Sequence, residues 1–231
     1  CAACGKEGDG DNMNTCNKCK AVKYCNATCK KKHKSKHKKP CERRVAELHD
    51  EELFEEPPPR EECPICFLPQ PLKAQESIFK TCCGKTICCG CNQEMLDEEK
   101  KRGKKGKLVN ICAFCRTPEA RTDGEENKRL KNLIQSDNSD AYHILGSYYE
   151  KGGNGLPQNY QKANELYLKA AERGCADGYY NIGVAYDVGR GVDVDQGKAK
   201  HYWELAAMAG YVDARYNLGM TEGKAGNHER A

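Results

Sequence analysis

Apolar and polar positions recur with a fixed period in the C-terminal part of the chain, and their pattern predicts paired α-helices. Three segments align at spacings of 37 and 36 residues: SDAYHILG at 139–146, ADGYYNIG at 176–183 and VDARYNLG at 212–219. Two further segments with paired alanines also align: KANELYLKAAERG at 162–174 and KAKHYWELAAMAG at 198–210. Self-similarity at such a period is typical of helical solenoids. The pattern therefore predicts an all-α repeat region over residues 136–231, with two complete units and a third that is cut short.

Aspartates and glycines recur at fixed places in each unit and predict how its helices begin, end and pack. Aspartates are expected at the N-caps of the first helices: Asp140, Asp177 and Asp213. Glycines are expected to end the second helices in a left-handed conformation: Gly174 and Gly210. Glycines inside the first helices predict close helix–helix contact: Gly146, Gly183 and Gly219. The unit resembles the SEL-one-like repeat, a relative of the tetratricopeptide repeat, and this implies a right-handed solenoid whose concave face binds peptides or partner domains.

Residues 42–62 have a different pattern, which marks a domain boundary. Their apolar positions predict one short amphipathic helix: Val45, Leu48 and Phe54. Three prolines at 57–59 are expected to end this helix and to form a stiff spacer. The segment is therefore interpreted as a helix and a proline-rich linker, and residues 118–135 as a second linker.

Composition separates the two halves of the chain. The 231 residues include 17 cysteines, and all but one of these precede residue 116. Residues 1–117 are poor in Leu, Ile, Val and Phe, so we expect them to fold by binding metal, since structural zinc sites contribute roughly 10–16 kcal/mol each. A secreted disulfide scaffold is the alternative, but the spacings favour metal and hence a reducing compartment, the cytoplasm or the nucleus. No apolar run is long enough to span a membrane, and the start at Cys1 rather than Met suggests a trimmed N-terminus.

The first cysteine cluster fits two zinc sites. Its ligands are spaced as Cys1-x2-Cys4, Cys16-x2-Cys19, Cys25-x3-Cys29 and His37-x3-Cys41. Structural zinc takes four Cys or His ligands, and pairs at these spacings can aim both ligands at one metal. The arrangement, with Tyr24 before Cys25, resembles the MYND zinc finger over residues 1–41. This resemblance implies binding of short proline-containing peptides, and it implies two interleaved sites: Cys1, Cys4, Cys25 and Cys29 in one, and Cys16, Cys19, His37 and Cys41 in the other.

Two features of this cluster leave alternatives open. His33 lies one helical turn before His37 and could replace it as a ligand, although the spacing from His37 to Cys41 fits better. The second feature is a run of seven lysines: Lys30, Lys31, Lys32, Lys34, Lys36, Lys38 and Lys39. The run indicates either a nucleic-acid or nuclear-import patch or a solvated helix face. The sequence favours the solvated face, because no aromatic residues for base stacking interleave with the lysines.

The second cysteine cluster, over residues 63–117, fits two further zinc sites. Its pattern is Cys63-x2-Cys66, then Cys82-Cys83-x4-Cys88-x2-Cys91, then Cys112-x2-Cys115. It resembles an all-cysteine RING finger, which implies two interleaved sites: Cys63, Cys66, Cys88 and Cys91 in one, and Cys82, Cys83, Cys112 and Cys115 in the other. The adjacent ligands Cys82 and Cys83 depart from the RING pattern and require an unusual backbone. Cys89 could replace Cys82, but it would point away from Cys88 and is interpreted as a free thiol.

The RING resemblance also implies a partner, a ubiquitin-conjugating enzyme, which such fingers activate by positioning rather than by covalent chemistry. Ile65 lies where these fingers place an apolar contact to that enzyme, and Met95 is expected to complete the apolar groove. Arg116 lies where active ligases place an arginine that contacts both ubiquitin and the enzyme. The alternative is that Ile65 packs the finger's own core and that Arg116 is a surface charge. The basic run Lys100–Lys107 is interpreted as a solvated loop.

These patterns predict a multidomain protein in which two small cross-braced zinc fingers precede an all-α helical-repeat solenoid. Sixteen ligands predict four zinc ions in closed structural sites. The sequence contains no catalytic triad, phosphate-binding loop or carboxylate pair. The favoured function is a scaffold that recruits other proteins through its fingers and repeats. The alternatives are a RING-type ubiquitin ligase whose substrate docks on the repeats, and a nuclear regulator that binds nucleic acid through its lysines.

Overall fold

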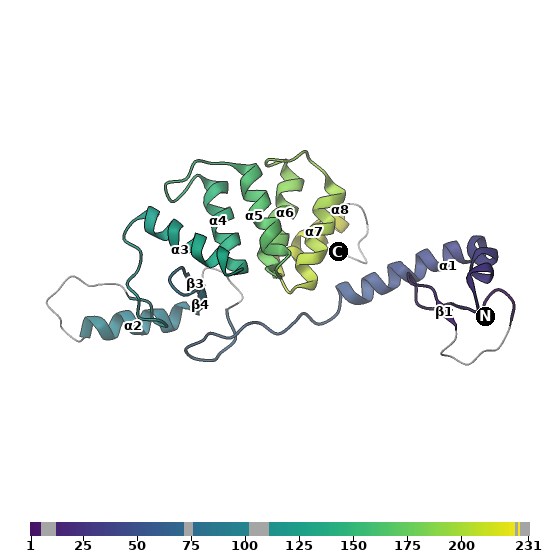
Figure 1. Ribbon diagram of the computed structural model, residues 1–231, viewed down its shortest axis with the longest axis horizontal. Helices are drawn as coiled ribbons and strands as arrows, with labels where there is room; N and C mark the ends of the chain where they lie inside the picture. The colour runs from purple at the N-terminus through teal and green to yellow at the C-terminus, as the bar shows by residue number, and fades with distance from the viewer. Residues whose placement is uncertain (6–12, 72–75, 102–110, 225, 227–231) are drawn as a thin grey trace. The chain divides into compact units, whose positions relative to one another are not determined.

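The structure, a computed structural model, describes residues 1–5, 13–71, 76–101, 111–224 and 226 (Figure 1). It comprises two compact units, Cys1–Glu56 and Pro57–Ala231. Most of the predicted basic loop at 100–107 lies outside the described residues. None of the described helices combines the length and the apolar character needed to cross a membrane.

The first unit consists of a small antiparallel hairpin followed by a long helix. Strand β1 (Asn14–Thr15) pairs with β2 (Lys23–Tyr24), and α1 (Ala27–Leu53) follows directly. The side chain of Asn26 caps α1, because its Oδ1 accepts a hydrogen bond from the Cys29 N–H at 2.9 Å. The buried cluster of this unit is Tyr24 together with three cysteines: Cys16, Cys19 and Cys41. Since three of its four members are predicted metal ligands, burial alone gives this unit little stability.

Helix α1 runs without a break through residue 41, where the sequence analysis places the end of the first finger. Pro40 lies inside the helix. Proline lacks the N–H that would bond to the carbonyl one turn earlier, so the helix loses a hydrogen bond there and yet continues. The following turns are joined by Arg44, which contacts Glu47 and Glu51. The helix expected within residues 42–56 is therefore the second half of α1.

The second unit begins with the second finger, whose ligands lie on two loops, a hairpin and a helix. Strands β3 (Ser77–Lys80) and β4 (Lys85–Cys88) pair in antiparallel register, and α2 (Cys89–Lys101) follows at once. Isolated bridges close the two remaining loops, between Glu62 and Pro69 and between Ile111 and Pro118. These bridges bring the ends of each Cys-x2-Cys loop together.

A helix that the sequence analysis did not predict, α3 (Asp123–Gln135), occupies most of the segment interpreted as a second linker. Thr122 caps it by accepting a hydrogen bond from the Glu125 N–H at 3.2 Å. Thr-x-x-Glu followed by apolar residues is a helix-start signal. The apolar residues of α3 are few, but they are spaced for one face: Leu130, Leu133 and Ile134.

The predicted repeat region is a stack of antiparallel helices, and Figure 1 shows them side by side. The helices are α4 (Ser139–Lys151), α5 (Tyr160–Ala171), α6 (Ala176–Val188), α7 (Gln196–Met208) and α8 (Val212–Lys224). Each packs against the next along the chain. The all-α fold class predicted for this region is confirmed.

Glycines behave largely as predicted, whereas the helix caps do not. A Cβ on Gly183 would lie 2.5 Å from the Trp203 ring, and one on Gly146 would lie 2.8 Å from the Tyr167 ring, so both positions require close contact. Gly174 and Gly210 adopt left-handed φ values of +87° and +91°. The aspartate N-caps are wrong, because Asn138 caps α4 and Cys175 precedes α6. The aspartates instead lie in the first turns, where carboxylates interact favourably with the helix dipole: Asp140, Asp177 and Asp213.

The β3–β4 hairpin packs against α3 and against α4, the first helix of the stack. Phe79 of β3 lies against a buried cluster that includes Leu130 of α3 and Ala141 of α4. Thr86 of β4 donates a hydrogen bond to the Asp140 carboxylate at 3.4 Å. The second finger and the start of the solenoid are therefore joined by both apolar and polar contacts.

The turn of the same hairpin fits closely against the end of α3. Gly84 has a left-handed φ of +66°, and a Cβ there would lie 3.0 Å from both Leu133 and Asn138. Asn138 also donates a hydrogen bond from Nδ2 to the Gly84 carbonyl at 3.4 Å. A side chain larger than hydrogen at position 84 would thus strain the turn and separate the finger from the helices.

Candidate functional site

Four groups of side chains gather with their ligand atoms within 4.8 Å of one another. The groups match the interleaved sets implied by the MYND and RING resemblances. The first finger holds Cys1, Cys4, Cys25 and Cys29 in one group and Cys16, Cys19, His37 and Cys41 in the other. The second finger holds Cys63, Cys66, Cys88 and Cys91 in one group and Cys82, Cys83, Cys112 and Cys115 in the other. In every group the ligands come from two segments far apart in sequence, so a bound ion would link those segments.

The spacing within each group fits zinc. In a tetrahedral site with Zn–S bonds of about 2.3 Å, neighbouring sulfurs lie about 3.8 Å apart. The observed Sγ separations include 3.8 Å for Cys4–Cys25 and 3.9 Å for Cys16–Cys41, Cys66–Cys88 and Cys83–Cys112. These distances are far longer than a disulfide bond of about 2.05 Å. The donor sets and their spacing support four structural zinc ions, with no ligand position left open for chemistry.

Four of the ligand pairs lie on loops of one common geometry, which we call knuckles. Each knuckle begins at the first cysteine of a Cys-x2-Cys pair, and the residue after the second cysteine donates its N–H back to the carbonyl of the first, at 2.9–3.0 Å. That residue always has a left-handed φ: Gly5, Lys20, Phe67 and Arg116. Only one of the four is glycine. The other three residues carry a Cβ, which is unfavourable at a left-handed φ, so the contacts of the rest of each loop must hold the backbone in this conformation. The spacing of the cysteines does not predict this shared conformation.

The knuckles also favour the thiolate form that binds zinc. The Cys19 N–H and the His37 side chain lower the pKa of Cys16 to about 6. Burial acts to raise the pKa of Cys63, but hydrogen bonds from the backbone N–H groups of Cys66, Cys88 and Ile65 outweigh it and lower that pKa to about 6. Both fingers thus present at least one cysteine that loses its proton readily.

His37, and not His33, lies with the ligands of the first finger. The His37 Nε2 lies 3.5 Å from the Cys19 Sγ, which matches neighbouring ligands on one zinc ion. The His33 Nδ1 instead lies 3.2 Å from the hydroxyl of Tyr24, a fully buried side chain. His33 therefore partners the buried phenol, and its ring stacks on His37 with centroids 5.9 Å apart.

Cys82 and Cys83 reach the same site although they are adjacent, because they lie in the turn of the β3–β4 hairpin. The N–H groups of Cys83 and Gly84 both donate to the carbonyl of Lys80, at 3.2 and 2.8 Å. In such a turn successive side chains need not alternate between two faces as they do in a strand. Cys115 Sγ lies 3.4 Å from Cys82 Sγ. Cys89 begins α2 and belongs to none of the four groups.

The second finger carries a shallow groove of about 170 Å³ next to its metal ligands. Ile65 of the first knuckle, Met95 of α2 and Arg116 of the second knuckle all line it. Two carboxylates that the sequence analysis did not single out, Glu94 and Glu98, line the same groove. Glu94 and Glu98 lie three and seven residues after the ligand Cys91, which places them on one face of α2, so the helical periodicity of this segment could have found them.

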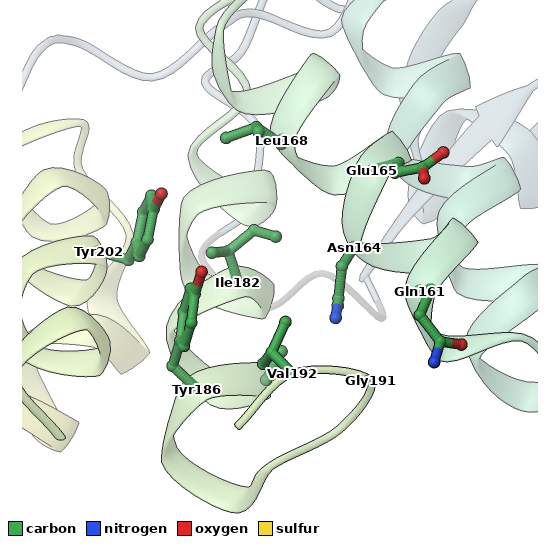
Figure 2. Close-up of a pocket in the computed structure, with 10 residues that line it drawn as sticks. Gln161, Asn164, Glu165, Leu168, Ile182, Tyr186, Gly191, Val192 and Tyr202 are labelled. Atoms are coloured by element: carbon green, nitrogen blue, oxygen red, sulfur yellow. The ribbon is translucent and has the colours of Figure 1, made fainter. Parts of the chain in front are cut away.

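The repeats carry a second pocket of about 230 Å³ between α5, α6 and α7 (Figure 2). Its floor is apolar, with Ile182 and Tyr186 from α6 and Tyr202 from α7. The rings of Tyr186 and Tyr202 stack in parallel with centroids 5.8 Å apart. Amide and carboxylate side chains of α5 form its edge: Gln161, Asn164 and Glu165. The pocket can receive an apolar side chain from another protein.

Comparison with known protein families matches the two ends of the chain. A family model described as the MYND finger matches residues 1–41, and a model described as the Sel1 repeat matches residues 139–175 and 176–211. The chain carries a MYND finger and two Sel1 repeats. The MYND and SEL-one-like resemblances drawn from the sequence are thereby confirmed. Because both modules mediate protein–protein interaction, a protein-interaction scaffold is the function that they support.

Several known proteins are similar to this chain over part of their length. Cytochrome c oxidase assembly factor 7 of Homo sapiens is 34% identical over 101 residues, which are 41% of this chain and 44% of that protein. The ERAD-associated E3 ubiquitin-protein ligase component HRD3A of Arabidopsis thaliana is 40% identical over 125 residues, 52% of this chain and 17% of that protein. A Sel1 repeat protein from Oxalobacter formigenes has a solved structure with 28% identity and a TM-score of 0.40, covering 43% of this chain and 42% of the other. The chain spans less than half the length of each.

Four zinc ions are expected per chain in native mass spectrometry, because sixteen ligands form four closed sets. Replacing Cys82 by serine should reduce the count to three, since the set then lacks one thiolate. Cys89→Ser is the matched control, because Cys89 is a neighbouring cysteine outside the four sets, and it should keep all four ions. A wild-type count below four, or loss of an ion from the Cys89 variant, would contradict this assignment.

Proposed function

We propose that this protein is a scaffold whose second finger binds a ubiquitin-conjugating enzyme while its Sel1 repeats hold the protein to be modified. The observation that carries the proposal is the groove that brings Ile65, Met95 and Arg116 together from three separate segments. The RING resemblance suggested these residues one at a time. Their convergence on one surface is what a binding site for that enzyme requires.

The chemistry of the groove suits a partner surface with apolar and basic side chains. Ile65 is 36% exposed, which leaves it available for contact. Glu94 and Glu98 add negative charge along one side. Complementary charges at the edge of such a contact speed association and fix its orientation more than they add affinity.

Arg116 suits a role in positioning ubiquitin. It is exposed, and its backbone is fixed by the knuckle bond from its N–H to the Cys112 carbonyl at 3.0 Å. A guanidinium has a planar set of five donors, so an arginine held in this way can bind two proteins at once. Transfer would then be catalysed by orientation of the reactants, and the zinc ions would serve only to hold the finger in shape.

The pocket between α5, α6 and α7 supports the second half of the proposal. An apolar floor with a polar edge is the usual composition of a peptide-binding pocket. The matched Arabidopsis protein is named as a component of a ubiquitin ligase, and its match to this chain covers 52% of the chain. We extend that role to this chain as part of the proposal.

Ile65→Ala is expected to weaken binding of the conjugating enzyme about tenfold, because burying an aliphatic side chain contributes roughly 1.5–3 kcal/mol. A screen would first find the conjugating enzymes that support ubiquitin transfer by the zinc-loaded chain. Isothermal titration calorimetry would then measure the affinity of the wild-type and variant chains for such an enzyme. Phe114→Ala is the matched control, since Phe114 holds the equivalent knuckle position but does not line the groove. If no conjugating enzyme supports transfer by the wild-type chain, the ligase part of the proposal fails and the scaffold alone remains.

A further inference from the structure

The first turns of α1 present an unusually dense positive charge to solvent. Seven of the ten side chains between residues 30 and 39 are lysines, and all seven are exposed. The inward side of the same segment is occupied by His33 and His37, which face Tyr24 and the metal ligands. The lysines therefore surround the outer face of the helix. We call this segment the lysine cuff.

The positive charges of the lysine cuff are not neutralised by described carboxylates. No lysine of the cuff forms an ion pair with any of them, whereas Arg44, slightly further along α1, contacts both Glu47 and Glu51. Within the cuff, like charges lie one helical turn apart: Lys30 with Lys34, Lys32 with Lys36, and Lys34 with Lys38. Such pairs repel each other on a helix. A bound polyanion would relieve this repulsion.

We propose that the lysine cuff binds the phosphate backbone of duplex DNA without sequence preference. The helix rises about 1.5 Å per residue, so seven charges over the cuff give one positive charge about every 2 Å. Duplex DNA carries one negative charge about every 1.7 Å of its axis. The two charge densities match, and a helix of about 10–12 Å diameter fits the major groove, which is about 12 Å wide.

Other partners suit the lysine cuff less well. Interfaces between proteins are poor in lysine and rich in aromatic and apolar anchors, and residues 30–39 contain no large apolar side chain. The same lack of an apolar face disfavours insertion into a membrane surface. Single-stranded nucleic acid is usually held by stacking on aromatic rings, and the nearby Tyr24 is buried. The missing aromatics exclude stacking, but phosphate contacts do not need them.

The test is fluorescence anisotropy of a labelled random-sequence duplex with the zinc-loaded full chain over a range of salt. If about four lysines contact phosphates, the affinity for the duplex should fall roughly a hundredfold between about 50 and 200 mM salt. The triple variant Lys31→Gln, Lys34→Gln and Lys38→Gln removes one stripe of the cuff. It should bind weakly and lose most of the salt dependence, while its zinc count stays at the wild-type value.

The matched control carries the same change of charge on α3 and α5: Lys128→Gln, Lys131→Gln and Lys169→Gln. These lysines are exposed, and the variant should bind DNA as the wild type does. An equal loss of DNA affinity in both triple variants would overturn the proposal, because DNA binding would then depend only on the net charge of the chain. Binding that is absent from the wild type, or that is tighter to anionic lipid vesicles or poly-glutamate at equal salt, would overturn it too. The proposal is independent of the ligase function.

Discussion

Removal of zinc by a chelator is expected to unfold both fingers and to loosen α3 and α4, while α5 to α8 stay helical. The fingers have buried clusters made mostly of ligands, so they lose roughly 10–16 kcal/mol per site when the metal leaves. Both sites of the second finger use the β3–β4 hairpin, through Cys82 and Cys83 in its turn and Cys88 at its end. That hairpin covers the buried cluster around Leu130 and Ala141.

Hydrogen exchange with mass spectrometry can resolve this effect along the chain. Protection should disappear in α1 and α2, fall in α3 and α4, and persist in α5 to α8. Far-ultraviolet circular dichroism should lose about a third of its helical signal, since α1 and α2 account for about that share of the described helical residues. The sequence alone predicts that all of residues 136–231 stay helical when the metal is removed. Unchanged protection of α4 would support that simpler view and contradict ours.

Single-ligand variants should separate the two fingers. Cys16→Ser removes a ligand of the first finger and should leave α3 and α4 protected. Cys82→Ser removes a ligand in the hairpin turn and should weaken them. If both variants change α4 alike, the effect is not transmitted through the hairpin.

Arg116→Ala is expected to reduce ubiquitin transfer about a hundredfold or more, with zinc content and conjugating-enzyme affinity nearly unchanged. Orientation of the reacting groups is the whole of the catalysis in this proposal, and small errors of position cost about that much. The side chain is separate from the ligands, so the metal site stays intact. Single-turnover discharge of a ubiquitin-loaded conjugating enzyme measures the effect without interference from later steps.

Arginine and alanine both place a Cβ at the left-handed φ of +61°, and a variant at the equivalent position of the other knuckle tests for any effect on the backbone. Phe67→Ala is this variant, because Phe67 holds the same place in the other knuckle, at a φ of +59°, and does not line the groove. This variant should transfer ubiquitin normally. Arg116→Lys should remain defective, because an ammonium group lacks the planar set of donors. Full activity of the lysine variant would show that charge alone suffices.

The ligand sets were predictable from sequence because the ligand spacing resembles MYND and RING fingers, whose two sites interleave; the spacing by itself does not fix which pairs share an ion. The structure also explains the departure at Cys82 and Cys83, which the RING pattern does not accommodate. Their adjacency depends on the backbone of one tight turn, where Gly84 has a positive φ. Glycine at that position was visible in the sequence, but its role depends on a hairpin that spacing alone does not reveal.

Long-range packing was beyond sequence reasoning. The hydrogen bond from Asn138 to Gly84 joins residues 54 positions apart, and no local pattern encodes such a contact. Helix α3 was missed for a different reason. Its segment is strongly polar, so the apolar face formed by Leu130, Leu133 and Ile134 was hidden among charged residues. A helix can be predicted from its hydrophobic pattern only when enough of its residues are apolar for the periodicity to be visible.

The shared conformation of the knuckles has an evolutionary consequence. The residue after the second cysteine is fixed in space by the ligand loop, yet its side chain does not contribute to metal binding. Glycine, lysine, phenylalanine and arginine all occupy this place in one chain, at Gly5, Lys20, Phe67 and Arg116. The turn conformation of each loop therefore does not depend on one particular side chain at this place. Natural variation or laboratory selection at these four positions can therefore change an exposed side chain while the ligand set is kept.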